Sequence, residues 1–240
     1  MTGIKTRPSP RRLFSRFVSR VLIPILPGRF SLAGRFWQAT VIDGYEPEVK
    51  HLDMLLSHCP GVAVDVGANQ GLWTLALHRS GLFRDIHSFE PAEELLGNLE
   101  GAQLGNVHIH KFALSDVCGT STLRTPVSAG LALNGWASLE QAFDCSNDAV
   151  HERKIRVETL DSLNLSALDF MKVDVEGHEL SMLHGGRETL KRFRPTCIVE
   201  VRARNLPTVE EYFLSLNAGY RLCDSMRECG VALSGENIMF

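Results

Sequence analysis

The sequence predicts an α/β fold built on an open, mostly parallel sheet with helices on both faces. Short apolar runs rich in β-branched residues, such as GVAVDV at 61–66, are typical of strands buried on both faces. Segments of helical periodicity separate these runs, and regular alternation of strand and helix favours a parallel sheet. The chain has 240 residues, 44% hydrophobic and 22% charged, an ordinary globular composition that excludes an extensively disordered or fibrous protein.

The predicted elements follow one another from residue 61. We expect strands at 61–66, 86–89, 107–112, 169–175, 196–201, 220–223 and 237–240. Helices are expected between them, at 72–81, 91–104, 180–193 and 207–216. Pro91 stands in the first turn of its helix and Gly105 follows its end, which are positions that these residue types favour. Residues 120–158 are polar and lack this βα rhythm, so we expect an insertion or a lid over a site there.

The first 42 residues differ from the rest in charge. They hold eight basic residues and no acidic one, whereas the remaining chain holds 17 basic against 28 acidic residues, a net charge of -11. We therefore expect a basic N-terminal segment at 1–42 and one α/β domain at 43–240. Apolar residues recur on one face of a predicted helix in the first segment, at positions 13, 14, 17, 18, 21, 22 and 25.

A basic amphipathic helix of this kind can lie on an anionic membrane surface, and we expect peripheral membrane contact through residues 11–26. A transit peptide, a helix that caps the domain and a disordered leader are the alternatives. No apolar run approaches the roughly 20 residues that span a bilayer. Scattered cysteines without a CxxC pair indicate reduced thiols, so we expect a cytoplasmic protein that can associate with the inner membrane surface. The net charge of -3 argues against a nucleic-acid partner.

A glycine-rich turn follows the first predicted strand. In open α/β sheets, ligands bind at the carboxyl ends of the strands. The chain there reads DVGANQG at 65–71, and glycines let the backbone approach a ligand closely. Asp65, Gly67, Asn69 and Gly71 are therefore candidate binding residues. Asp65 would repel a pyrophosphate, and it would suit a ligand with a cationic amino-acid end.

Glu90 ends the second predicted strand, where a carboxylate can accept protons from both hydroxyls of a ribose. A ligand with an ammonium group, a ribose and no phosphate is S-adenosylmethionine, which is the predicted cofactor. Ser115 and Asp116 follow the third strand, and we expect them to border its adenine. Taken singly, Asp65 and Glu90 could each be a helix-capping or loop acid instead.

The fourth predicted strand ends in the acidic sequence DVEGHE at 174–179, which borders the expected position of the methyl group. A hydroxyl is a poor nucleophile, so a general base beside it accelerates transfer. His178 is the leading base candidate because its ordinary pKa lies near neutrality. Asp174 would border the donor or the acceptor, and Glu176 would orient His178 or the acceptor. The alternatives are plain helix-terminal and solvated residues, or a Mg²⁺ or Mn²⁺ site; we expect no metal.

These motifs together resemble the FkbM-type methyltransferases. The resemblance covers about residues 45–240 and is carried by VDVGANQG at 64–71, FEP at 89–91, ALSD at 113–116, TLD at 159–161, FMKVDVEGHE at 170–179 and NIMF at 237–240. It implies the Rossmann-like class I methyltransferase fold, S-adenosylmethionine as methyl donor, and O-methylation of a small-molecule hydroxylated acceptor such as a sugar, glycolipid, polyketide or related metabolite. The family's binding motifs map onto Asp65, Gly67, Asn69, Gly71 and Glu90. Gln70 and the basic segment depart from the pattern.

Two other functions fit the same architecture. An NAD-dependent oxidoreductase would share the sheet, but GxGxxG is missing from the first turn and Asp65 is badly placed for a pyrophosphate. A non-catalytic scaffold that binds the donor without turnover is the other alternative. Acids at all the strand ends argue against such a loss of activity.

Overall fold

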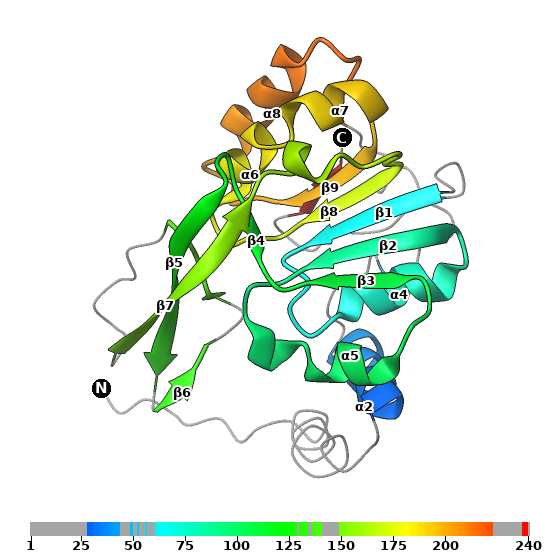
Figure 1. Cartoon of the computed structure of the whole chain (residues 1–240), viewed down its shortest axis with the longest axis vertical. Coiled ribbons are helices and arrows are strands. Elements are labelled where there is room, and N and C mark those ends of the chain that lie inside the picture. Colours follow the sequence, from blue (N-terminus) through cyan, green and yellow to red (C-terminus); the bar gives the residue numbers. More distant parts are fainter. Residues whose placement is uncertain are drawn as a thin grey trace, which may run out of the picture.

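The computed structural model of the protein describes residues 28–43, 49, 52, 56, 61–128, 130–133, 136–140, 149–222 and 237–239. Its centre is a six-stranded sheet with the order β10-β9-β8-β1-β2-β3 (Figure 1). Five strands are parallel, and the short β10 runs antiparallel to β9. The strand bounds are β1 Gly61–Val66, β2 Phe83–Phe89, β3 Val107–His110, β8 Phe170–Val173, β9 Thr196–Glu200 and β10 Asn237–Met239. The predicted mostly parallel sheet is therefore confirmed.

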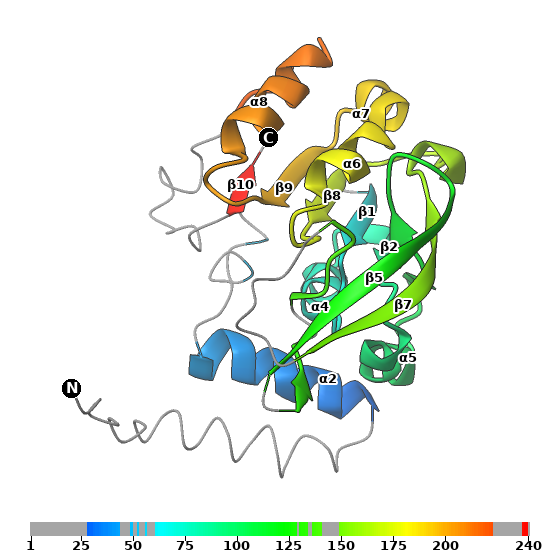
Figure 2. The same cartoon turned by 90° about the vertical axis from the view of Figure 1, so that its left-hand side faces the viewer.

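Helices cover both faces of this sheet, as expected (Figures 1 and 2). On one face lies α4 (Leu72–Ser80), which packs its Trp73 and Leu77 against inward residues of β1, β2, β8 and β9. α2 (Gly28–Trp37) and α5 (Gly97–Ala102) lie beside α4. The opposite face is covered by α6 (Glu179–His184), α7 (Arg187–Phe193) and α8 (Leu206–Ser215). Alternate residues of each central strand thus enter two separate cores.

Two predicted helices are broken. The segment 91–104 forms a 3₁₀ turn, η5 (Glu93–Leu95), followed by α5. The segment 180–193 divides into α6 and α7 at Gly185 and Gly186. A Cβ atom on Gly185 would lie 1.8 Å from the carbonyl oxygen of Ser115, so the chain passes too close for any other residue. A long-range contact of this kind leaves no mark in the local periodicity.

The described part of the segment 120–158, expected as an insertion or a lid, departs from the βα rhythm because it forms strands of a second sheet. Within it, β5 (Gly119–Ser128) and β7 (Ala149–Glu158) pair antiparallel along their length. With β4 (Ala113–Leu114) and β6 (Leu131–Ala132) they form a second sheet, in the order β4-β7-β5-β6. Figure 1 shows β5 and β7 extending from the carboxyl-end side of the central sheet.

Other expectations fall at the ends of the chain. Residues 220–222 form no strand, and position 223 lies outside the described residues. The predicted helix at 11–26 also lies outside them, so it stays a prediction. Of the predicted basic segment 1–42, the structure describes α2 and a π-helical turn, η3 (Gln38–Asp43). Among the described residues, no helix has the length and apolar character needed to cross a membrane.

Candidate active site

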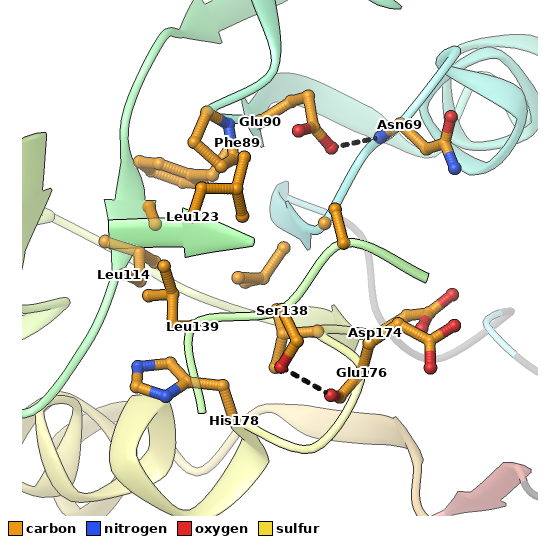
Figure 3. Close-up of a pocket in the computed structure, with 16 residues that line it drawn as sticks. Asn69, Phe89, Glu90, Leu114, Leu123, Ser138, Leu139, Asp174, Glu176 and His178 are labelled. Atoms are coloured by element: carbon orange, nitrogen blue, oxygen red, sulfur yellow. Dashed lines mark hydrogen bonds between the residues drawn. The ribbon is translucent and has the colours of Figure 1, made fainter. Parts of the chain in front are cut away.

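A pocket lies at the carboxyl ends of the central strands, where open α/β sheets bind their ligands (Figure 3). Its wall combines the turns that follow β1, β2 and β8, strand β4, and one arm of the second sheet. The lining residues are Val66, Gly67, Asn69, Phe89, Glu90, Pro91, Ala113, Leu114, Leu123, Ala137, Ser138, Leu139, Asp174, Val175, Glu176 and His178.

The turn after β1 needs its glycine. Gly67 has a φ of +80°, and a Cβ atom there would lie 1.8 Å from the carbonyl oxygen of Asp174. Asn69 also has a left-handed backbone, with a φ of +50°. Gly71 has a φ of +83° at the start of α4, where it packs against Leu99 outside the pocket lining. The turn therefore presents Gly67 and Asn69 to the pocket and uses Gly71 to begin the helix.

Glu90 projects into the pocket from the end of β2 (Figure 3). Its Oε2 accepts a 2.8 Å hydrogen bond from the Asn69 amide, and its Oε1 accepts one of 2.8 Å from the Ala92 amide. These bonds fix the carboxyl group while each oxygen keeps a second lone pair for a ligand. Burial raises the pKa of Glu90 to about 7, although the two amide bonds oppose the shift.

Asp65 does not line this pocket. Alternation along β1 directs its side chain to the α4 face, where Oδ2 accepts a 2.6 Å hydrogen bond from the Thr74 hydroxyl. Burial raises its pKa to about 6, with nearby Lys172 opposing the shift. Contact between Asp65 and a ligand stays a prediction. Lys172 has the carboxylate partner that a buried lysine requires, because its Nζ lies 3.4 Å from Glu200 Oε2.

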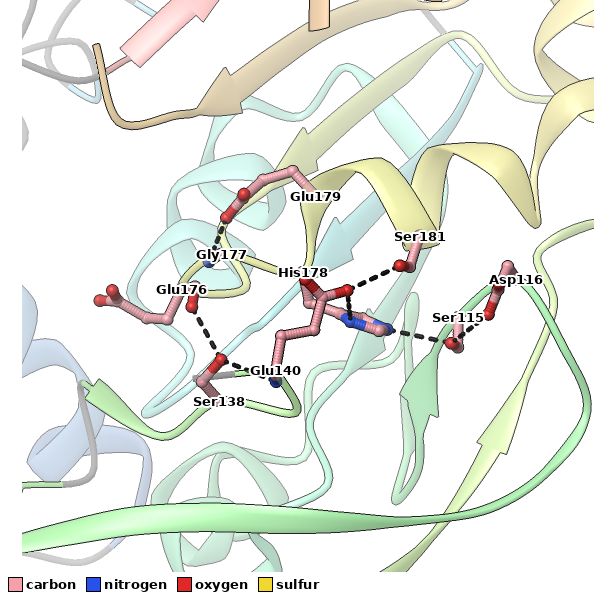
Figure 4. Close-up of polar contacts among 9 residues, drawn as sticks. All are labelled: Ser115, Asp116, Ser138, Glu140, Glu176, Gly177, His178, Glu179 and Ser181. Carbon is pink, nitrogen blue, oxygen red and sulfur yellow. Dashed lines mark hydrogen bonds and ion pairs between the residues drawn. The ribbon is translucent and has the colours of Figure 1, made fainter. Parts of the chain in front are cut away.

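His178 joins three segments of the chain (Figure 4). Its Nδ1 lies 2.8 Å from Glu140 Oε1, and its Nε2 lies 3.0 Å from the Ser115 hydroxyl. The Ser115 hydroxyl is also 3.0 Å from Asp116 Oδ1, and Ser181 donates a 2.7 Å bond to Glu140. The structure thus brings His178 into the pocket wall and places Ser115 behind it. Ser115 and Asp116 lie outside the pocket lining, where Ala113 and Leu114 stand instead.

Asp174 and Glu176 line the pocket beside a cluster of further acids. Burial raises the pKa of Asp174 and of Glu200, whose carboxyl groups hydrogen-bond to each other. Burial also raises the pKa of Glu176 to about 7, and the nearby Asp174 adds to this shift. Arg202 reaches Glu176 with Nη2 at 3.6 Å from Oε2. These acids therefore retain protons near neutral pH more readily than free carboxyl groups.

Sequence reasoning missed the contribution of the second sheet and its connection. Leu123 lies on β5, and the segment 137–139 closes one side of the pocket. Ser138 donates a 2.8 Å bond to the carbonyl of Glu176, which ties this segment to the turn after β8. The only sequence signal was the break in rhythm at 120–158. Trp136, in the same segment, is 58% exposed and lies outside the lining.

In the described part of the chain, His, Cys, Asp and Glu side chains form no group of three that could hold a metal ion. Trp73 does not line the pocket and is buried against Phe170, with ring centroids 6.5 Å apart. It serves the core on the α4 face.

The sheet order, the antiparallel last strand and the pocket at the carboxyl ends define the fold of the class I S-adenosylmethionine-dependent methyltransferases. Residues 65–230 match the family model described as the methyltransferase FkbM domain, so the chain belongs to the FkbM methyltransferase family. No curated protein matches the chain.

One solved structure supports the same fold. A methyltransferase FkbM from Methylobacillus flagellatus KT matches with a TM-score of 0.53 and 18% identity, covering 88% of this chain and 53% of its own. This chain therefore spans about half the length of that protein. Weaker likenesses are a provisional RNA methyltransferase, PH1948 from Pyrococcus horikoshii (TM-score 0.41, 12% identity, 84% and 82% covered), and the DhpI–SAM–HEP complex (0.36, 10%, 97% and 82%). Only the first bears on the fold.

Proposed function

We propose that this protein transfers the methyl group of S-adenosylmethionine to a hydroxyl of a small-molecule acceptor such as a sugar, glycolipid, polyketide or related metabolite. The observation that carries the proposal is the fixed carboxyl group of Glu90 in the pocket, bonded by two backbone amides. A carboxylate held this way is suited to both hydroxyls of a ribose. The donor's reacting end then extends toward Asp174, Glu176 and His178, which line the same pocket.

The chain's contribution to methyl transfer is mainly alignment. The acceptor oxygen forms a bond to the methyl carbon while the carbon–sulfur bond breaks, and the sulfonium becomes a neutral thioether. Holding the two reactants in line supplies much of the acceleration. Carboxylates of Asp174 and Glu176 at the strand end would favour the cationic sulfonium of the donor. The segment 137–139 closes the pocket and limits access of water.

His178 receives the hydroxyl proton in this proposal. Its Nε2 lies 3.0 Å from the Ser115 hydroxyl, outside the pocket lining, so the ring has to turn from Ser115 toward the pocket before Nε2 accepts the proton. Glu140 acts as a positioning residue, because its carboxylate holds Nδ1 at 2.8 Å and thereby keeps the Nε2 lone pair available. The same carboxylate stabilises the imidazolium that forms. This arrangement of base and orienting acid recurs in enzymes that activate hydroxyls.

Glu140→Gln tests that role by nitrogen NMR of the His178 ring. We expect the wild-type ring to carry its proton on Nδ1, and the variant to lose this tautomer preference. The pH–rate profile of methyl transfer should shift with it, while donor affinity stays unchanged. Ser181→Ala is the matched control, since it removes another bond to Glu140 without touching the ring. An unchanged ring spectrum in Glu140→Gln would refute the positioning role.

Donor binding is tested by calorimetry with S-adenosylhomocysteine and with NAD. We expect the first to bind and NAD to give no heat, because the turn at 65–71 lacks the glycine pattern of pyrophosphate sites. Binding of NAD alone would favour the oxidoreductase. Methyl-labelled donor incubated with hydroxylated metabolites then tests turnover. A protein that binds the donor and labels no acceptor would fit the scaffold alternative.

A further inference from the structure

The orientation of α2 is fixed by its inward side. Leu32 is fully buried, and with Phe36 it packs against α4 and α5 through Leu75 and Leu99. The Arg79 guanidinium lies over the Phe36 ring, 5.1 Å from its centroid. These contacts on one side determine which residues the helix presents on the other.

The outward side of α2 is apolar along its length. Helical periodicity places Phe30, Ala33, Gly34 and Trp37 on one stripe, opposite Leu32. Phe30 is 50% exposed and Trp37 is 44% exposed. Both are large aromatic side chains, and no charged residue falls between them on this stripe. Figure 2 shows α2 at the lower edge of the described structure, away from the helices α6, α7 and α8.

The charge of this end of the chain complements an anionic surface. α2 belongs to the first 42 residues, which hold eight basic residues and no acid, whereas the rest carries a net charge of -11. An anionic membrane therefore attracts this end and repels the remainder, which would orient the molecule. Exposed aromatic residues flanked by arginines are typical of helices that lie at the lipid interface.

We propose that the outward stripe of α2 docks on an anionic lipid membrane, with Phe30 and Trp37 entering the headgroup region. A second copy of the chain fits this stripe less well. A ten-residue helix offers far less than the roughly 800 Å² per partner of a stable interface. A symmetric pairing would also bring two acid-free basic segments together.

The test uses the full chain and two kinds of vesicle, phosphatidylcholine alone and phosphatidylcholine with phosphatidylserine. We expect sedimentation with the anionic vesicles only. The double variant Phe30→Ser, Trp37→Ser should bind the anionic vesicles at least about tenfold more weakly than wild type. Leu214→Ser is the matched control, because Leu214 is an exposed apolar residue (58%) on α8. Equal binding by wild type and the double variant would overturn the proposal.

Two further measurements keep the test independent of how the variant folds. Tryptophan emission of a Trp136→Phe variant, which keeps Trp37 and the buried Trp73, should shift to shorter wavelength on anionic vesicles. The same variant with Trp37→Phe added should show no such shift. No shift in the first variant, or an equal shift in both, would overturn the proposal. Sedimentation equilibrium should show the same mass for wild type and double variant. A dimer that the double variant dissociates would assign the stripe to a second copy. A lowered melting temperature of the double variant would show that the chain itself covers the stripe, which also contradicts lipid docking.

Discussion

At Gly67, the turn after β1 packs closely against the turn after β8. The residue's left-handed φ of +80° alone disfavours a side chain, and the Asp174 carbonyl stands 1.8 Å from where a Cβ atom would be. Gly81 has a similar φ of +69° at the end of α4, but nothing lies within 4 Å of its Cβ position. Substitutions at the two glycines therefore distinguish the cost of backbone strain from the additional cost of a close contact.

We expect Gly67→Ala to lower the free energy of unfolding by about 3 kcal/mol or more. Gly81→Ala should cost only about 1–2 kcal/mol, the strain of a left-handed residue. Denaturant titration of both variants measures the difference. Equal losses would mean that the chain at Gly67 moves away from Asp174 at little cost.

Glu90 makes donor binding depend on pH. Burial raises its pKa to about 7, and the ionised form is the better acceptor for ribose hydroxyls. Affinity for S-adenosylhomocysteine should therefore be highest above pH 7 and fall as the pH drops below it. Calorimetry across this range measures the fall.

Glu176 provides the matched control, since its pKa is also raised to about 7 and it lines the same pocket. Glu176→Gln should keep the pH dependence of donor affinity, and Glu90→Gln should abolish it. The reverse result would place the donor's ribose elsewhere in the pocket.

The sequence identified residues that border the pocket better than it identified their orientation. Gly67, Asn69, Glu90, Asp174, Glu176 and His178 all line it, because position after a strand end is a property of the chain order. The orientation of Asp65 depends on the alternation of β1, which could have been read from GVAVDV. Glu140 could not be found, because it is a distant residue brought to His178 by tertiary folding.

At the scale of elements, β2 and β3 carry a row of stacked rings. His87 lies between His108 and His110, with ring centroids 4.9 and 5.3 Å away, and His110 stacks on Phe89. Burial and the neighbouring imidazoles lower the pKa of His87 and bring that of His110 to about 4. Asp85 faces the exposed end of this row through His108.

This row should make the protein less stable as the pH falls. Between an unfolded pKa of about 6.5 and the folded value, the unfolded chain binds protons that the folded chain does not. The stability that the unprotonated His110 ring contributes is fully present above about pH 6.5, and it is lost as the pH falls toward 4. Carboxyl groups with a raised pKa, such as those of Glu90 and Asp65, have the opposite effect on the pH dependence of stability. A histidine variant must therefore be compared with wild type to isolate the effect of the row.

The free energy of unfolding should decline less steeply between about pH 6.5 and 5 in His110→Gln than in wild type. The difference in slope should be smaller than roughly 1.4 kcal/mol per pH unit, the value for uptake of one full proton. His151→Gln, on the exposed part of β7, should leave the decline as in wild type. Urea titrations at several pH values give the slopes. A slope unchanged in His110→Gln would remove the histidine row as its source.

Elements of the central sheet were predictable because each has its own local signal, whereas the second sheet was not. Strands β1, β8 and β9 are mainly apolar, and most of their residues are buried. β5 and β7 are polar and mostly exposed or half-buried, so their sequences resemble loops. Their pairing joins segments that are far apart in the sequence, and the second sheet contributes the pocket wall that contains Leu123 and the segment 137–139.

At the scale of the whole molecule, the topology places three strand-end turns around one pocket. β1 lies between β2 and β8, so the turns that carry Gly67, Glu90 and Asp174 meet at the edge where the chain changes direction. The second sheet closes the remaining side. Cofactor and acceptor would therefore share one pocket in the proposed reaction, with the donor on the β2 side and the acceptor near His178.

The most direct test of this account is a double-mutant cycle on the contact between Glu90 and the donor's ribose. Calorimetry would compare S-adenosylhomocysteine with its analogue lacking both ribose hydroxyls, on wild type and on Glu90→Gln, above pH 7. Each single change should weaken binding by about 1.5–3 kcal/mol, and the two together should cost little more than either alone. Glu94→Gln, with a half-exposed carboxylate on the same loop, should leave affinity unchanged. Fully additive losses would contradict the assignment of Glu90 to the ribose.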